Sequence, residues 1–230
     1  MAENAYYTLL TSLPHIDSLF DSKVTPLSRL QLDRRLSMLS REDMETLVKV
    51  EQIMQWSHLD HDVKEEALIK LASQLVNGFN SPCLRELINW RLDMRSVVAA
   101  LRRITRGEQA PSISRWSYGT RYAYIRRNWS SPTLGLQSTF PWITDAVACF
   151  EKKEHYKLEK ILLGTIWSKL NELGANHRFD FEAVIIYVLR WSLVARWTTY
   201  EGKRAVTRFR ELTELALGEF SAQLPGEKAY

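Results

Sequence analysis

Two histidines, His58 and His61, are three residues apart and lie beside Asp60 and Asp62. This spacing could present two imidazoles to one metal ion at the end of a helix. The sequence offers no evident third strong ligand, and a histidine next to an aspartate at a helix junction is usually a capping or solvated residue. We therefore predict no metal site at these residues, and the sequence indicates no cofactor.

Neighbouring carboxylates at Glu42 and Asp43, and again at Glu65 and Glu66, could serve acid–base chemistry. Both pairs fall in first turns of predicted helices, where negative side chains complement the helix dipole. The chain has neither a glycine-rich phosphate-binding loop nor a Ser or Cys nucleophile in a recognisable elbow. We therefore expect no catalytic residue, although residues distant in sequence could still assemble a small hydrolase site.

Positive charge is concentrated between Arg85 and Arg127. This window has ten arginines and three acids, a net of +7, whereas the whole chain carries only +4. Such asymmetry favours an acidic protein surface, nucleic acid or an anionic lipid face as a partner. A solvated arginine-rich face is the alternative interpretation, and the composition does not decide between them.

A helix over 82–106 would carry much of this charge. Ser81 is a typical N-cap, Pro82 suits the first helical position, and Gly107 suits the residue after the last turn. Apolar residues at intervals of three and four predict a face that packs in the core, namely Leu87, Trp90, Met94, Val97, Leu101 and Ile104. Another face of this helix, with the basic residues that follow it, supplies the residues that we predict to contact a partner: Arg91, Arg95, Arg102, Arg106, Arg126, Arg127 and Trp129.

Arginines and aromatic residues alternate in RWSYGTRYAYIRRNW, which runs from Arg115 to Trp129. A single-stranded nucleic acid could use this mixture, with arginines on phosphates and aromatic rings stacked on bases. The same residue types are enriched at protein interfaces, and an amphipathic helix with an aromatic core face would also produce the pattern. For this segment we rank a protein interface first, a structural amphipathic helix second and nucleic-acid binding third. As a function of the whole chain, a helical single-strand nucleic-acid binder is the alternative to a protein-binding role.

The composition, with 45% hydrophobic and 11% aromatic residues, suffices for a buried core. Cys83 and Cys149 are far apart and outside any CxxC pair, so the sequence favours a reducing cytosol over a disulfide framework. No segment has 18 uncharged apolar residues in a row, and the most apolar one, Ala183 to Trp197, is interrupted by Arg190 and Arg196. We interpret it as a buried helix and expect a cytoplasmic protein without membrane insertion.

Helical periodicity is nearly continuous from Pro26 onward, which predicts an all-α bundle of about nine helices. The pattern resumes near Ser114 after the loop GEQAPSIS, and Asn128 to Pro141 is irregular because it contains two prolines and a glycine. We predict one compact unit made of residues 1–107 and 108–230, with a hinge near 107–113. The remaining predicted helices span Pro26–Leu39, Ser40–Trp56, Asp62–Asn77, Pro141–Phe150, Tyr156–Leu173, Asp180–Thr199 and Lys203–Leu224.

Three segments together resemble a bacterial family of unnamed function encoded beside V/A-type ATPase subunits. They are YYTLLTSLP from Tyr6, RRNWSSPTLGLQSTFPW from Arg126 and FDFEAVIIYVLRWSLVARW from Phe179. Members of that family resemble the C-type central-stalk subunit of these rotary ATPases, which is known as the d-type in eukaryotes. The run from Val184 to Lys203 is similar to an apolar helix of that subunit followed by a Tyr, charged residues and a Gly-Lys pair, and the basic helix before Gly107 is similar to another.

This resemblance implies a non-catalytic, funnel-like helical adaptor that sits on the membrane rotor ring and receives the central stalk. Its partners would be rotor-ring and central-stalk subunits, and it would lie on the inner face of the membrane without entering it. The full C-type protein has three related helical units, and this shorter chain would lack or trim one of them. The resemblance leaves open whether the chain replaces the C-type protein in its complex or acts as an accessory or assembly factor.

Overall fold

The computed structural model of this chain describes residues 2–54, 78, 81–112, 115–117 and 119–223, with residues 2–5 and 203–223 described by their backbone alone. Within these ranges the protein has eight helices and no strand, which confirms the predicted all-α class. The helices are α1 (Ala2–Ser12), α2 (Arg29–Leu36), α3 (Arg41–Met54), α5 (Pro82–Thr105), α6 (Tyr122–Arg127), α7 (Ile143–Glu151), α8 (His155–Gly174) and α9 (Phe181–Gln223).

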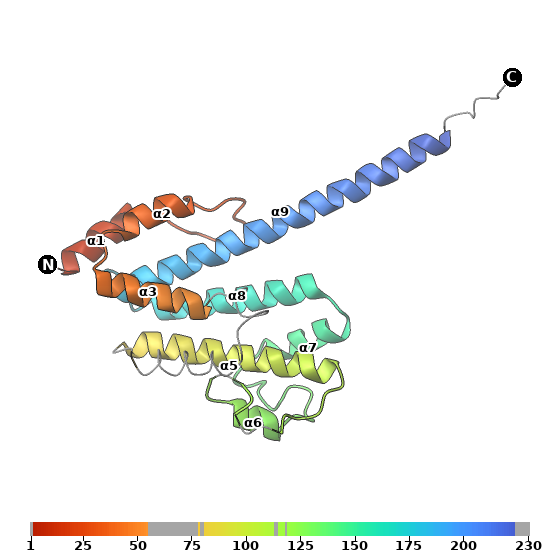
Figure 1. The fold of residues 1–230 in the computed structure, drawn as a ribbon, viewed down its shortest axis with the longest axis horizontal. Coiled ribbons are helices and arrows are strands. Elements are labelled where there is room, and N and C mark those ends of the chain that lie inside the picture. Colours follow the sequence, from red (N-terminus) through yellow and green to blue (C-terminus); the bar gives the residue numbers. More distant parts are fainter. Residues whose placement is uncertain (1, 55–77, 79–80, 113–114, 118, 224–230) are drawn as a thin grey trace.

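Helix α9 is the central element of the bundle. Helices α1, α3 and α8 contact it directly, and α5 packs against α3 while also contacting α6 and α7. Figure 1 shows α1 and α2 along one side of α9, α3 and α8 along the other, and α5 and α6 beyond them. The second half of α9 extends past the other helices (Figure 1). Among the described helices, none combines the length and the apolar character needed to cross a bilayer.

The first half of α9 is buried because its apolar residues surround the helix rather than forming one stripe. Val184, Ile185, Val188 and Val194 are all fully buried. Burying side chains of this kind stabilises the fold by about 1.5–3 kcal/mol each. The predicted buried helix is therefore confirmed, and neighbouring helices are needed on several sides of it.

Three polar side chains of α9 hold the segment between α1 and α2. The Tyr187 hydroxyl donates to the Pro14 carbonyl at 2.8 Å, and the Trp191 indole N–H donates to the Leu27 carbonyl at 2.9 Å. The Trp197 indole N–H donates to the Phe20 carbonyl at 3.3 Å. Each bond satisfies a backbone acceptor that would otherwise lack a partner beside the core. The irregular segment is thereby fixed along α9.

Both predicted ends of α5 are confirmed. The Ser81 hydroxyl accepts from the Leu84 amide at 3.4 Å, and Pro82 is the first helical residue. At the other end Gly107 has φ of +75°, its amide donates to Ile104 O, and the Glu108 amide donates to Arg103 O. These two bonds form a Schellman motif, which requires a left-handed residue that glycine supplies readily. Whether residues 107–113 act as a hinge between two regions stays a prediction.

The C-terminal helices differ from the sequence-based expectation in one respect. Helix α8 ends at Gly174 as predicted, and Asp180 caps α9 by accepting from the Ala183 amide at 2.9 Å. However, α9 does not stop near Thr199 and no separate helix begins at Lys203, because one helix of 43 residues runs to Gln223. The predicted break near Thr199 is therefore wrong: Gly202 lies within α9, and a single helical glycine costs only about 1 kcal/mol, which is too little to end a helix by itself.

The N-terminal region also departs from the predictions. Helix α1 was not predicted, and α2 begins at Arg29 rather than at Pro26. The Ser28 hydroxyl accepts from the Gln31 amide, while the Gln31 side chain accepts from the Ser28 amide at 2.9 Å, so a capping box fixes this start. The spacing S-x-x-Q is typical of a capping box, so this helix start could have been predicted from the sequence. The Ser40 cap of α3 is confirmed, since its hydroxyl accepts from the Asp43 amide at 3.1 Å.

Several predictions concern residues outside the described ranges. These include the helix over 62–77, the pair His58 and His61, and the carboxylates Glu65 and Glu66. Ser114 is also outside them, but residues 115–117 and 119–121 are not helical, so the expected return of helix near Ser114 is wrong for these neighbours. The irregular stretch before Pro141 and the short helix after it, observed as α7, are confirmed.

A buried carboxylate explains why the chain is not helical before α6. Asp93, on α5, accepts from the amides of Thr120 at 2.6 Å and Arg121 at 3.0 Å, and from the Thr120 hydroxyl at 2.9 Å. The side chain is only 7% exposed, so these bonds are needed to offset its desolvation. Gly119 lies against it with φ of +75°. Asp93 thus fastens this loop to α5 and fixes the start of α6.

We predict that Gly119→Ala destabilises the protein by about 2–4 kcal/mol, because strain at positive φ is added to a steric clash. An added Cβ would collide with Asp93 Oδ1 and lie 2.8 Å from the Asp93 amide nitrogen. Gly107→Ala is the matched control, since Gly107 has the same φ of +75° but no atom within 4 Å of an added Cβ. Urea unfolding followed by circular dichroism would measure both variants, and equal losses would contradict the role of Asp93.

A second prediction concerns alkaline pH. Burial raises the pKa of Tyr187 to about 12, with the charge of Arg35 acting in the opposite direction. The neutral phenol is thus favoured in the folded protein. The contribution of the neutral Tyr187 phenol to the free energy of unfolding is fully present below pH 10. It is lost as the pH rises from 10 to 12.

Absorbance titration of tyrosinate checks this assignment. Desolvation, with the hydrogen bond to Asp43, also raises the pKa of Tyr6 to about 12, so Tyr6 and Tyr187 should both titrate later than an ordinary tyrosine. Tyr187→Phe should remove one of these late titrations and Tyr6→Phe the other. An unchanged late step in Tyr187→Phe would show that Tyr187 is accessible to solvent in the folded state.

Candidate interaction surface

The predicted contact residues do not share one surface. Arg91 is 1% exposed and lies in the core, so its assignment to a partner-facing stripe is corrected. Four of the predicted contact residues are half-buried, namely Arg95, Arg102, Arg126 and Trp129. Two are exposed, namely Arg106 and Arg127. Arg91 is four residues after Leu87 and three before Met94, a spacing that places it on the apolar face of α5. That spacing was the sequence signal for its burial.

The buried guanidinium of Arg91 lies at the end of α3. Its Nη2 donates to the carbonyl of Met54, the last residue of α3, at 3.3 Å, and its Nη1 lies 3.7 Å from Met94 Sδ. Burial, with the positive charges of Arg95 and Arg196, lowers the pKa of Arg91 well below its ordinary value. Arg91 therefore has a structural role in joining α5 to α3.

A hollow of about 570 Å³ adjoins Arg91 between α3, α5, α8 and α9. Two ion pairs lie on its wall, Arg29 with Glu51 and Arg196 with Glu159, each with a closest N···O distance of 2.7 Å. Sequence reasoning found neither pair, because their partners come from different helices. The acids are 8% and 17% exposed, whereas their arginine partners are 44% and 34% exposed, so each pair has a shielded carboxylate and a guanidinium open to solvent. Most of the remaining wall is apolar: Met54, Leu162, Leu163, Ile166, Leu170, Leu189, Leu193 and Ala195.

The C-terminal end of α5 forms a rigid basic corner with the chain around Trp129. Arg103 pairs with Glu108 at 2.7 Å and its guanidinium lies 5.8 Å from the centre of the Trp129 ring. The Trp129 indole N–H donates to Glu108 O at 3.0 Å, and its ring contacts Trp116 edge-on with centroids 5.6 Å apart. These contacts restrain the backbone that carries the neighbouring arginines. We define the basic corner as Arg102, Arg106, Arg126 and Arg127.

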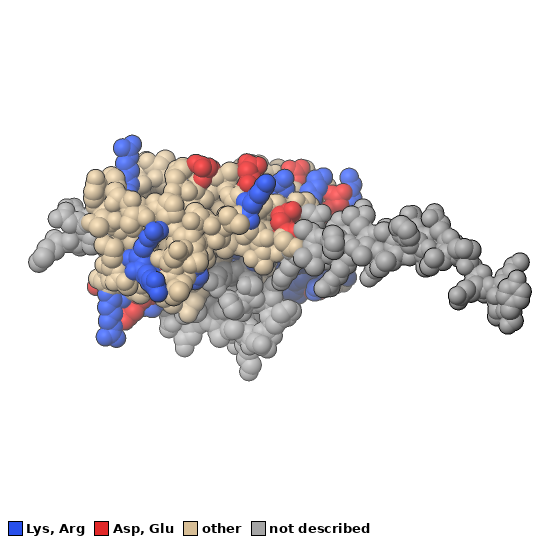
Figure 2. All heavy atoms as spheres, turned by 90° about the horizontal axis from the view of Figure 1, so that it is seen from above, with Lys and Arg blue, Asp and Glu red and all other residues tan. Residues whose placement is uncertain are grey.

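Charge on the basic corner is only partly compensated. Arg106 is 72% exposed and its nearest acid, Glu108, is 3.9 Å away. No ion pair involves Arg102, Arg126 or Arg127 within the described part of the chain. By contrast, Arg121 pairs with Asp93 at 3.6 Å and lies over Phe140. Figure 2 views the opposite side of the molecule, that of α1 and α2, where basic and acidic side chains are scattered.

The aromatic residues near the basic corner are occupied by intramolecular contacts. Trp116 is 5% exposed and its indole N–H donates to Tyr122 O at 2.8 Å. Tyr124 is 38% exposed, and its hydroxyl donates to Gly135 O at 3.2 Å. A platform for stacking bases needs open ring faces. The buried Trp116 ring is therefore closed to a base, whereas the Tyr124 ring stays exposed although its hydroxyl is bonded.

The fold and this corner define an all-helical protein with a buried central helix and a rigid, arginine-bearing end. The chain matches the model of the family described as Protein of unknown function (DUF2764) over residues 65–218, which is more than half of its 230 residues. It therefore belongs to this family. Neither the curated proteins nor the solved structures contain a significant match to the chain.

This family assignment corrects the identification based on sequence resemblance. The matching family is one of unknown function and brings no link to the C-type central-stalk protein of V/A-type ATPases. The identification with that protein's family was therefore wrong. The expected funnel and its missing helical unit depended on that identification alone and lose their basis with it.

We predict that Arg91→Ala destabilises the fold by about 2–5 kcal/mol, because it leaves a cavity and removes the donor to Met54 O. Arg91→Met, which keeps most of the volume, should lose less. Arg106→Ala is the control and should change stability by at most about 0.5 kcal/mol, since its side chain is exposed. Urea midpoints would measure all three, and equal midpoints for Arg91→Ala and Arg106→Ala would contradict the buried role of Arg91.

Proposed function

We propose that this chain is a non-catalytic adaptor or accessory subunit of a bacterial V/A-type ATPase, where it binds rotor-ring or central-stalk subunits on the inner face of the membrane. The observation that carries the adaptor role is the basic corner. Its arginines lie at the C-terminal ends of α5 and α6, beside a stretch of chain where Trp129 contacts Trp116 and donates to Glu108 O. Such preorganised charge steers a partner into register at little entropic cost.

The shape of the molecule supports the same role. Helix α9 has 43 residues and, at 1.5 Å per residue, is about 65 Å long. Its first half is fixed in the core, and its second half extends past the other helices (Figure 1). A rigid element of this kind can bridge two components of a larger assembly. Such an adaptor would connect the ring and the stalk of a rotary ATPase. A pull-down tests whether these are the components that the chain binds.

A single-strand nucleic-acid binder remains the rival function. It would use the same arginines, but two of the aromatic rings, Trp116 and Trp129, are held in contact with each other. Binding of that kind would weaken steeply as salt rises and would be similar for unrelated oligonucleotides. If the basic corner instead binds a protein, the tagged chain should retain one defined set of subunits at moderate salt after nuclease treatment.

The prediction is that Arg102→Glu with Arg106→Glu lowers the recovery of ATPase ring and stalk subunits at least about tenfold, equivalent to about 1.4 kcal/mol of binding free energy. The measurement is a tagged pull-down from the native host with nuclease and mass spectrometry. The reversed charges would repel an acidic partner, while the exposed or half-buried positions should leave folding intact.

The matched control is Lys23→Glu with Arg34→Glu, which changes charge equally at two exposed positions. Arg34 is on α2, across α9 from α5 and α6 in Figure 1. Equal recovery from both double variants would contradict the basic corner as the binding surface. Recovery of nuclease-sensitive material without ATPase subunits would contradict the proposed assembly and favour the rival.

A further inference from the structure

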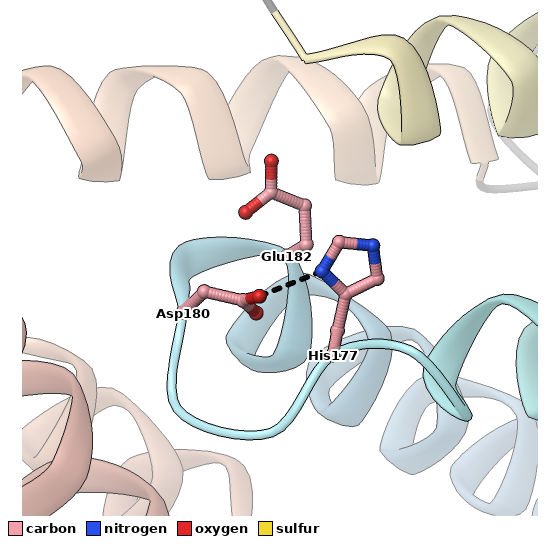
Figure 3. Close-up of side chains that lie close together, drawn as sticks. All are labelled: His177, Asp180 and Glu182. Carbon is pink, nitrogen blue, oxygen red and sulfur yellow. Dashed lines mark hydrogen bonds and ion pairs between the residues drawn. The ribbon is translucent and has the colours of Figure 1, made fainter.

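Three potential metal ligands converge at the turn between α8 and α9. His177 lies in this turn, Asp180 is the N-cap of α9, and Glu182 is in its first turn. One ligand atom from each residue lies within 4.8 Å of the other two. Figure 3 shows the Asp180 carboxylate directed at the His177 ring and the Glu182 carboxylate on the same side of the turn. None of these residues belongs to the pair His58 and His61 considered from the sequence.

Local contacts account for only part of this arrangement. Asp180 uses Oδ1 to cap α9 by accepting from Ala183 N at 2.9 Å, and its Oδ2 lies 2.7 Å from His177 Nδ1. The Glu182 carboxylate makes no hydrogen bond or ion pair with the described residues. A cap needs a single oxygen. The second oxygen of Asp180, the imidazole and the Glu182 carboxylate thus stand beside one another without being required for the helix end.

We propose that His177, Asp180 and Glu182 bind one Zn²⁺ ion, with water completing a tetrahedral site. Nitrogen and carboxylate oxygen donors suit this borderline metal, and two carboxylates neutralise its charge. Zinc–ligand distances are about 2.0–2.2 Å, so three atoms this close need only small side-chain rotations to reach one ion. All three residues are half-buried, which leaves room for both the rotation and the water.

The neighbouring thiol of Cys83 is not one of the three clustered ligands. Cys83 is in the first turn of α5, and burial raises the pKa of its thiol, with the negative charges of Glu182, Glu86 and Asp180 acting in the same direction. The ion would therefore fasten the α8–α9 turn to α9 through the three named residues.

The experiment is a Zn²⁺ titration of the purified full chain, with a chromophoric chelator as competitor. The unmodified chain should bind one equivalent through this site. Glu182→Gln and His177→Ala should each weaken that binding at least tenfold. Glu182→Gln tests the site without disturbing a hydrogen bond, so the proposal is falsifiable even if His177→Ala folds poorly. The chain should also unfold at a higher temperature with Zn²⁺, and this shift should vanish in Glu182→Gln.

Control variants separate this site from other donors. His155→Ala removes an exposed histidine at the start of α8, and His58→Ala with His61→Ala removes the other pair. Both should keep the binding, as should Cys83→Ser. Binding that survives Glu182→Gln and His177→Ala unchanged, or that is lost in the His58 and His61 variant or in Cys83→Ser, would overturn the proposal. The result is independent of the adaptor function.

Discussion

The burial of the first half of α9 is the constraint on which the rest of the bundle depends. This helix is apolar around most of its circumference, so one neighbouring helix cannot cover it. Helices α1, α3 and α8 surround it, and the side chains of Tyr187, Trp191 and Trp197 hold the connecting segment that closes the remaining side. These contacts place α3 where α5 can pack on it, and α5 in turn positions α6 and α7.

The arginines of α5 illustrate how one residue type takes several roles in a single helix. Arg91 enters the core and binds the C-terminal carbonyl of α3, whereas Arg103 pairs with Glu108 and covers Trp129. Arg106 stays largely in solvent at the end of the same helix. The dense positive charge of this region therefore overstates the basic surface, because part of it is used to hold the fold together. What remains for a partner is a small, rigid corner rather than a long stripe.

The two proposed sites lie at opposite ends of α5. The basic corner is at the C-terminal end of α5. The α8–α9 turn with His177 lies beneath the N-terminal end of α5, which is the yellow helix in Figure 3. A Zn²⁺ ion bound at the α8–α9 turn would stiffen the start of α9 without contacting the arginines of the basic corner. Charge recognition and metal binding would then be separable, which is why different variants test them.

The sequence by itself determined the helical class and several helix ends, because caps act over three or four residues. Ser81, Gly107 and Asp180 mark their helix ends by chemistry local to each position. Part of the basic corner could likewise be predicted, since Arg102, Arg106, Arg126 and Arg127 are not buried. Only the tertiary structure decided that Arg91 is buried, that Asp93 holds the loop before α6, and that His177 meets Glu182. Burial and convergence depend on which distant segments pack together, and the free energy of that packing is not contained in any short stretch of residues.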